Sequence, residues 1–178
     1  MKNTILKISA LSAVVLLAAG CATTMPPVAQ AVAELQSKSG SAVKGVVTFN
    51  QLAAGGVQVS GTISGLKPNQ EHGFHVHEKG DCSSPDGMSA GGHFNPEAKA
   101  HGSHTSAAHH AGDMPNLKAD ANGVATFAVL LADLTVLASK TSVLERSVIV
   151  HVNPDDYTSQ PVGNAGGRMA CGLVKQIK

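Results

Sequence analysis

The chain has 178 residues, of which 43% are hydrophobic and 14% are charged, and its 13 basic and 12 acidic residues give a formal net charge of +1. This length is typical of one domain. The near-neutral charge, the single tyrosine and the lack of tryptophan leave no basic stripe or aromatic platform, so we expect no nucleic-acid partner. Nine histidines are many for such a chain, and most of them lie between residues 72 and 110.

Residues 1–20 are typical of a signal peptide. Two lysines give a positive start, and 8–19 is an apolar run too short to cross a bilayer comfortably. The run ends in LAAGC at 17–21, which resembles a bacterial lipoprotein cleavage site, although alanine stands where leucine is commoner three positions before the cysteine. We expect lipidation of Cys21, which would hold the protein to a membrane without a spanning helix. The alternative is ordinary cleavage that leaves Cys21 as a free thiol, a liability in an oxidising compartment.

After a tether at 21–29, we expect one all-β domain over residues 30–178. Short β-branched segments alternate with glycine-rich turns, which is typical of a β-sandwich or barrel. The segments expected to form strands are 43–49, 57–63, 71–78, 123–131, 147–152 and 168–174. Two long stretches, 79–122 and 153–167, resist strand assignment. Loops of this length in a compact domain are usually functional or disordered, and we interpret both as active-site loops.

Two of the predicted strands carry histidines. His75 and His77 are two residues apart, so both rings point to one face while Phe74 and Val76 enter the core. His151 lies between two valines in the same setting. A His-x-His pair alone is often only a solvated strand face, and it indicates a metal site only together with further ligands.

The first long loop supplies those ligands, His93, His101, His110 and Asp113. Imidazole suits both zinc and copper, and a carboxylate completes a mixed nitrogen and oxygen shell. The seven residues together indicate a paired-metal site. His109 competes with His110 for a ligand role, and the three-residue step to Asp113 favours His110.

The chain has three cysteines, Cys21, Cys82 and Cys171. If Cys21 carries lipid, Cys82 and Cys171 remain, and export would place them where disulfides persist. Their bond would close a long loop and contribute on the order of 4–5 kcal/mol, less any strain. The alternative is a pair of buried thiols, which export makes the weaker interpretation.

These motifs resemble the signatures of the Cu/Zn superoxide dismutase family. The matching motifs are GFHVHE at 73–78, GGHFNP at 91–96 with His101 after it, HAGD at 110–113 and GGRMACG at 166–172. Residues 153–157 resemble the bacterial periplasmic branch, and the resemblance runs from about residue 30 to the C-terminus. It implies an all-β, Greek-key β-sandwich or flattened barrel, immunoglobulin-like, with two long active-site loops.

The resemblance also implies one copper and one zinc per subunit, joined by His93 as a bridging imidazolate. The implied copper ligands are His75, His77, His93 and His151. The implied zinc ligands are His93, His101, His110 and Asp113. Asp155 would link a copper histidine to a zinc histidine, Arg168 would guide an anion beside the copper, and Cys82 and Cys171 would form the intrasubunit disulfide.

The implied activity is superoxide dismutase, in which His93 and Arg168 are catalytic. Two superoxide anions become oxygen and hydrogen peroxide while copper alternates between Cu(II) and Cu(I), and zinc is structural. The alternative is a periplasmic copper or zinc binding or storage protein without turnover, which has no need of a cation such as Arg168. We expect location in the periplasm or cell envelope, anchored to the membrane through lipidated Cys21, as a monomer or homodimer.

The remaining histidines and two lysines receive no metal role. His72 matches a family position where the imidazole is a buried scaffold group, whereas His104 and His109 match no ligand position. Lys79 and Lys99 near the ligand loops either help to attract superoxide or are simply solvated.

Overall fold

The computed structural model describes residues 26–178, so the expected signal peptide (1–20) and Cys21 lie outside the described residues. Strands dominate this part of the chain, and its one helical element is a short 3-10 turn, η1 (Met88–Ala90). Between residues 26 and 178, no helix has the length and apolar character needed to cross a membrane.

Seven antiparallel strands form one sheet in the order β5-β8-β9-β1-β2-β3-β7. These strands are β1 (Ala29–Ser37), β2 (Lys44–Gln51), β3 (Val57–Ser64), β5 (Phe74–His77), β7 (Ala125–Leu131), β8 (Ser147–His151) and β9 (Arg168–Gln176). A separate two-stranded sheet joins β4 (Glu71–His72) to β6 (Leu117–Lys118). The first three strands follow one another as a meander, and the last strand returns to the free side of β1, so non-consecutive strands are neighbours.

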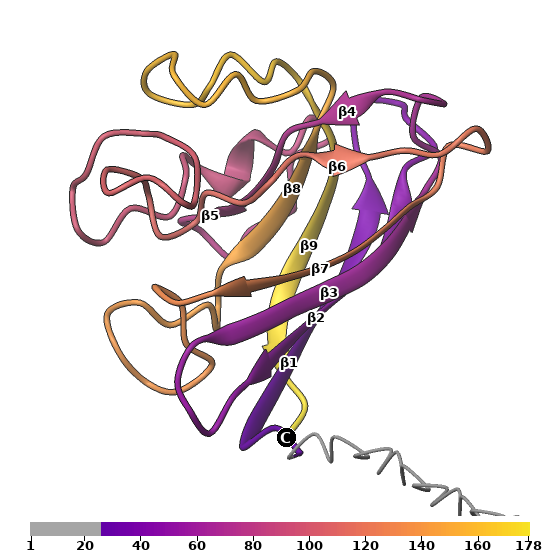
Figure 1. The fold of residues 1–178 in the computed structure, drawn as a ribbon. Helices are drawn as coiled ribbons and strands as arrows, with labels where there is room; N and C mark the ends of the chain where they lie inside the picture. Colours follow the sequence, from indigo (N-terminus) through magenta and orange to yellow (C-terminus); the bar gives the residue numbers. More distant parts are fainter. Residues whose placement is uncertain (1–25) are drawn as a thin grey trace, which may run out of the picture.

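The sheet curls strongly, as Figure 1 shows. Its two edge strands, β5 and β7, approach each other across the curl, where the rings of Phe74 and Phe127 meet edge to face with centroids 5.0 Å apart. A curled antiparallel sheet that nearly closes in this way is a flattened barrel. The predicted all-β, Greek-key fold class is confirmed.

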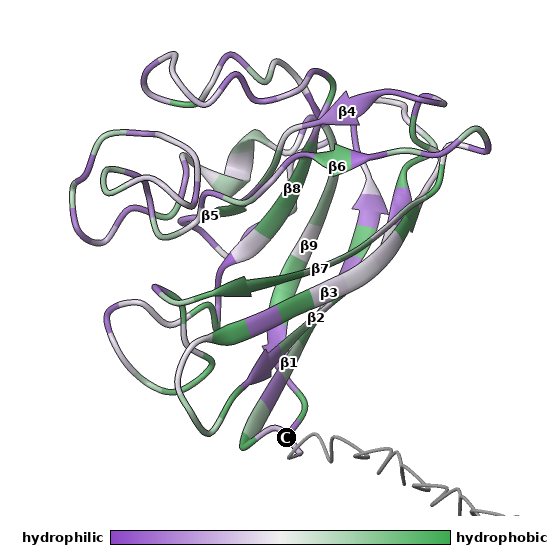
Figure 2. Cartoon of the chain, viewed as in Figure 1, coloured by the Kyte–Doolittle hydropathy of each residue, from purple (hydrophilic) through white to green (hydrophobic). Residues whose placement is uncertain are grey.

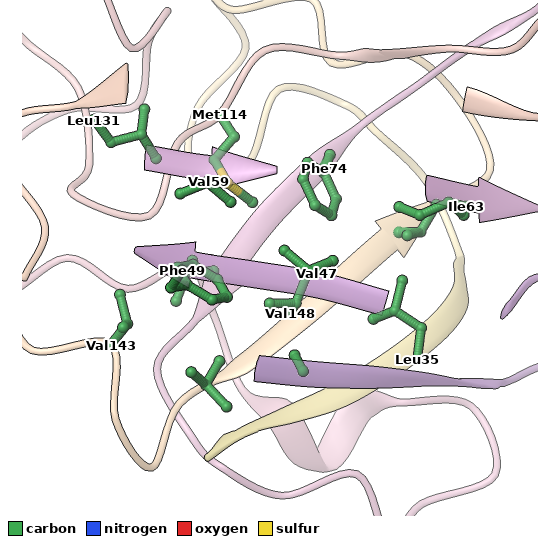
Figure 3. Close-up of a cluster of buried hydrophobic side chains, with 14 of the residues drawn as sticks. Leu35, Val47, Phe49, Val59, Ile63, Phe74, Met114, Leu131, Val143 and Val148 are labelled. Carbon is green, nitrogen blue, oxygen red and sulfur yellow. The ribbon is translucent and has the colours of Figure 1, made fainter. Parts of the chain in front are cut away.

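The core lies inside the curl because the strands alternate buried and exposed residues. Val47 and Phe49 on β2 are completely buried, whereas their neighbour Val46 is 45% exposed. Figure 3 shows these side chains packed with Val59, Ile63 and the other labelled residues. Figure 2 shows the same division by hydropathy, with the centre of β8 hydrophobic and the loop after it mostly hydrophilic.

The structure contains one long strand, β1, that the pattern of the sequence did not predict. Its inward positions include Ala31 and Ala33, both fully buried, and alanine is a poor strand former. The predicted strand 71–78 is also divided into β4 and β5 at Gly73, where an added Cβ would lie 2.8 Å from the Cβ of Ala165. The predicted loops 79–122 and 153–167 are indeed largely without strands.

Replacing Phe49 with alanine should lower the free energy of unfolding by about 3–5 kcal/mol, because it removes a fully buried ring and leaves a cavity. The matched control is Val46→Ala on the same strand, which should cost less than about 1 kcal/mol because the side chain is half exposed. Urea unfolding of both variants measures the difference, and equal losses would contradict the assigned core face.

Candidate metal centre

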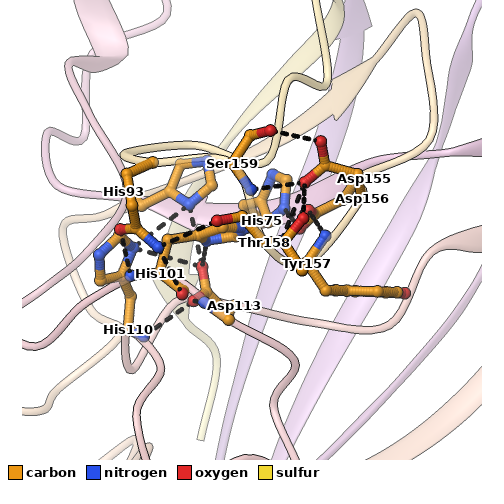
Figure 4. A network of polar contacts seen from close by, with 12 residues as sticks. His75, His93, His101, His110, Asp113, Asp155, Asp156, Tyr157, Thr158 and Ser159 are labelled. Atoms are coloured by element: carbon orange, nitrogen blue, oxygen red, sulfur yellow. Dashed lines mark hydrogen bonds and ion pairs between the residues drawn. The ribbon is translucent and has the colours of Figure 1, made fainter.

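Two clusters of buried donor groups meet at one imidazole. The first contains His75, His77, His93 and His151, the second contains His93, His101, His110 and Asp113, and the donor atoms within each cluster lie within 4.8 Å of one another. All seven residues are buried. The structure therefore brings together every residue predicted as a metal ligand, and Figure 4 shows the network around the second cluster. His93 belongs to both.

Strand β5 organises both clusters because the loop after it folds back onto its free edge. Val76 donates its N–H to Gly112 O at 2.9 Å, and Phe94 donates to Val76 O at 2.9 Å. Gly112 in turn donates to Phe94 O at 2.9 Å, and an added Cβ on Gly112 would lie 2.2 Å from Val76 O. With Phe74 and Val76 in the hydrophobic core, the two β5 histidines point to the other face, toward the ligands of the loop.

Two backbone carbonyls fix the tautomers of two histidines in the first cluster. His77 Nδ1 lies 3.0 Å from Gly91 O, and His151 Nδ1 lies 3.1 Å from Gly166 O. Because a carbonyl only accepts, each Nδ1 must carry the proton and each Nε2 keeps a free lone pair. Those two Nε2 atoms lie 3.4 Å apart, so both lone pairs are available inside the cluster.

The other two rings of the first cluster present buried nitrogens without any hydrogen-bond partner. His75 Nε2 donates to Asp155 Oδ2 at 2.8 Å, which leaves Nδ1 free, and His93 donates from Nδ1 to Asp113 Oδ1 at 2.9 Å, which leaves Nε2 free. Both free nitrogens are buried and unpartnered. A buried polar atom without a partner is costly, and a metal ion would satisfy both of them at once.

Asp113 holds the second cluster together. Its Oδ1 accepts from His101 Nδ1 at 3.1 Å and from His93 Nδ1, and it lies 3.4 Å from His110 Nδ1. Its Oδ2 accepts from the backbone N–H of His110 at 2.8 Å and of Gly102 at 3.2 Å. Burial alone would raise the pKa of Asp113, but these hydrogen bonds hold it far below the usual range, so the carboxylate is charged.

Asp155 connects the two clusters from behind. Its Oδ2 accepts from His75 and its Oδ1 accepts from His101 Nε2 at 2.9 Å. Hydrogen bonds of this kind orient ligand rings and set which nitrogen faces the metal. The predicted position of Asp155 between a ring of each cluster is what the structure shows.

Asp155 and His101 are held in place by residues that the sequence did not single out. Asn116 binds the backbone of Asp155 twice, at 2.9 Å through each amide atom. Gln160 binds the backbone of His101 in the same reciprocal manner, also at 2.9 Å. Gly163, with φ of +66°, lies where an added Cβ would come 1.8 Å from Asp155 Oδ1. Glycine is the residue that a positive φ favours, but the sequence does not indicate that this glycine packs against Asp155.

Arg168 lies beside the first cluster at the start of β9, opposite His151 in the register. Its guanidinium donates to Gly87 O at 2.9 Å and to Gly91 O at 2.6 Å. Gly91 O is the same carbonyl that fixes His77. The charge of Arg168 helps to lower the pKa of both His77 and His151, although burial and the neighbouring rings have larger effects. The guanidinium is thus fixed at the edge of the first cluster and remains partly exposed.

The predicted disulfide joins Cys82 to Cys171. It ties the first long loop to β9, three residues after Arg168, and Cys171 packs with Ala90 and Ile149 in a small buried cluster. The disulfide and Arg168 therefore hold the same turn of the loop, around η1, against the sheet.

Electrostatics divide the rings into neutral and charged ones. Burial lowers the pKa of His93 to about 4 and that of His151 to about 3. Burial would also lower the pKa of His101, but hydrogen bonds from its two nitrogens to Asp113 and Asp155 outweigh it and raise the pKa to about 9. At neutral pH the His101 imidazolium therefore supplies the positive charge that a metal ion would supply in the same cluster.

His72, His109, Lys79 and Lys99 lie outside the two clusters. His72 is buried and its Nδ1 donates to His151 O and Val152 O, both at 3.0 Å, as expected of a scaffold group. His110, and not His109, is the residue in the second cluster. Lys79 and Lys99 are exposed, and their role in attracting an anion stays a prediction.

Comparison with known proteins agrees with this geometry. The family model described as copper/zinc superoxide dismutase (SODC) matches residues 43–174. The chain belongs to this family. It is 44% identical over 149 residues to Cu-Zn superoxide dismutase 2 of Brassica juncea, a match that covers 80% of this chain and 95% of the relative.

Solved structures of similar proteins share the fold. A SOD-like protein from Bacillus subtilis matches with 36% identity and a TM-score of 0.73, over 80% of this chain and 96% of that one. The clock protein EA4 matches with 38% identity and a TM-score of 0.74, over 85% of this chain and 95% of that one. Because differently described proteins share one fold, the donor residues and not the fold must carry the functional argument.

The metal-free protein should be most stable near pH 6.5 and should lose stability on both sides. Below about pH 6.5 the unfolded histidines take up protons that folded His93 and His151 resist until about pH 4 and 3, so stability falls as the pH falls. The contribution of His101 is complete below about pH 6.5 and is lost as the pH rises through about 9. Urea unfolding across this range measures the curve.

The matched variant is His101→Gln, which should remove much of the decline at high pH and leave the decline at low pH in place. A stability that does not change between about pH 4 and pH 9 would contradict the assigned proton positions.

Proposed function

We propose that this chain is a superoxide dismutase that holds one copper ion in the first cluster and one zinc ion in the second. The observation that carries the proposal is His93, whose two ring nitrogens face different clusters while Arg168 stands beside the first. One shared ring would couple ions held in the two clusters, and a fixed cation at the edge of one cluster suits a small anionic substrate.

The donor sets fit these two ions. The first offers four imidazoles, among them the unpartnered nitrogens of His75 and His93. The second offers three imidazoles and the charged carboxylate of Asp113, a mixed set that suits zinc. Bound copper would supply a one-electron couple, and bound zinc would supply fixed charge without redox chemistry.

The residues of the chain then have distinct tasks in the reaction, in which two superoxide anions and two protons give oxygen and hydrogen peroxide. Arg168 attracts and orients the anion with a planar pair of donors that Gly87 O and Gly91 O hold in place. His93 can hold a proton on Nε2 while its Nδ1 stays in the second cluster. Asp155 keeps the rings of His75 and His101 in a fixed orientation while His93 gains and loses this proton.

A copper or zinc store without turnover is the alternative, and the position of Arg168 counts against it. A guanidinium close enough to lower the pKa of His77 and His151 also opposes the binding of a cation there. A storage site gains nothing from that repulsion, whereas an enzyme that acts on an anion does.

We also propose that residues 1–20 are a signal peptide, that 21–29 are a tether and that 30–178 are the enzyme domain, held in the periplasm or cell envelope by lipid on Cys21. The start of β1 and the end of β9 lie at the same end of the sheet (Figure 1). Arg168 lies at the other end of β9, roughly 25–30 Å away for a strand of this length. Such an anchor would leave the clusters open to the compartment.

The protein loaded with copper and zinc should inhibit the reduction of cytochrome c by xanthine oxidase, and Arg168→Ala should retain both metals but lower kcat/KM by about tenfold or more. Activity of the parent should fall with added salt more steeply than that of the variant. Lys175→Ala is the matched control, since it removes an exposed charge from the far end of the same strand. A fully metallated parent without activity would refute the enzyme.

Substituting Cys21 by serine should move the protein from the membrane fraction to the soluble fraction of a bacterial host, because the acyl chains would have no attachment site. Thr23→Ala is the control and should leave the protein on the membrane. A parent protein that takes up no labelled palmitate would contradict the anchor.

A further inference from the structure

His104 and His109, which have no ligand role, lie on the first long loop, near Asp133 in the loop after β7. All three line one cavity of about 180 Å³. Asp113, the carboxylate of the second cluster, lines the same cavity. The cavity therefore connects two partly buried histidines and an exposed carboxylate with a buried group of the metal centre.

The two ring nitrogens of His109 have separate neighbours. Its Nδ1 donates to Ser106 O at 2.6 Å, so the proton of the neutral ring is on Nδ1. Its Nε2 lies 2.8 Å from Asp133 Oδ2. With Nδ1 held by the carbonyl, Nε2 and this carboxylate oxygen are two potential metal-ligand atoms that face each other in the wall of the cavity. Ligand histidines are typically held by a carbonyl in this way.

His104 adds an atom that is already withdrawn from water. Its Nδ1 is buried and has no hydrogen-bond partner. Burying such an atom without a partner is unfavourable. Since its ring lines the same cavity as His109 and Asp133, a cation held by those two residues would also give this nitrogen a partner.

We propose that His104, His109 and Asp133 form a third, peripheral site for a borderline divalent cation such as Zn²⁺, at the outer end of the cavity that leads to Asp113. Two imidazoles and one carboxylate suit zinc or copper and not magnesium or calcium. In the described part of the chain, only the two inner clusters bring three or more donors within 4.8 Å of one another. His104 therefore has to turn toward His109 and Asp133 on binding, and the peripheral site binds more weakly than the inner sites.

The peripheral site gives zinc its first contact on the way to the second cluster. Asp133 is about half exposed, with 48% of its side chain accessible, whereas Asp113 is 1% accessible. An ion from solution reaches Asp133 and His109 first and then has a cavity with Asp113 in its wall ahead of it. This step rests on the proposed function, because it takes the second cluster as the zinc site, whereas the peripheral site itself does not.

Two measurements with Zn²⁺ test the proposal. Protein whose inner sites are filled is titrated with Zn²⁺ by calorimetry, and we expect a further equivalent whose affinity falls at least about tenfold in His109→Ala and in Asp133→Asn. Metal-free protein is then mixed with less than one equivalent of Zn²⁺ and a chromophoric indicator, and both variants should take up the ion several-fold more slowly. Mg²⁺ should produce no such binding.

Glu34→Gln is the matched control, because it removes one exposed negative charge from β1 and should leave binding and uptake unchanged. Far-UV circular dichroism shows that each variant is folded. A parent that binds no further equivalent, or variants that bind it as tightly as the parent, would overturn the peripheral site. No activity is measured, so failure of the dismutase assay would leave this result standing.

Discussion

The interaction on which the rest of the structure depends is the hydrogen bond from His93 to Asp113, which fixes the His93 ring between the two clusters. The carboxylate of Asp113 accepts the hydrogen bond from Nδ1, and Nε2 is buried without a partner. The neighbouring elements hold the His93 ring in this position. Strand β5 supplies a rigid edge, the loop folds back on it through Val76 and Gly112, and the disulfide holds the outer turn of the loop.

Such a placement is unfavourable until a cation is present. Imidazoles and carboxylates buried side by side lose hydration, and hydrogen bonds recover only part of it. The chain compensates by charging His101 between Asp113 and Asp155, with its pKa raised to about 9. Replacing that proton by a metal at Nδ1 leaves the hydrogen bond from Nε2 to Asp155 intact, so the cluster need not rearrange. Metal binding is thereby coupled to the folding of the loops.

The sequence predicted most of the fold and the donor residues because both depend on local patterns. Alternating β-branched segments mark β2, β3 and β7, and the spacing of His75, His77 and His151 on strands places them on one face. It did not predict β1, whose buried alanines carry little strand preference. It also chose His110 over His109 only by the step to Asp113, which the structure confirms.

The supports of the site could not be predicted because they join residues far apart in the sequence. Gly91 O and Gly166 O set two tautomers, yet a backbone carbonyl leaves no mark in the sequence of its own residue. The same holds for the amide pairs of Asn116 and Gln160 and for the contact of Gly163 with Asp155. Each of these depends on which loops meet, and that is decided by the folded sheet.

Electron paramagnetic resonance tests most directly whether His93 joins the two ions. Protein with Cu²⁺ in the first cluster and Zn²⁺ in the second is compared with protein that carries Co²⁺ in place of the zinc. If His93 binds both ions through its two nitrogens, the spins couple through the ring and the copper signal is lost in the cobalt sample. A copper signal that is the same in both samples would contradict the shared ligand and with it the account given for this site.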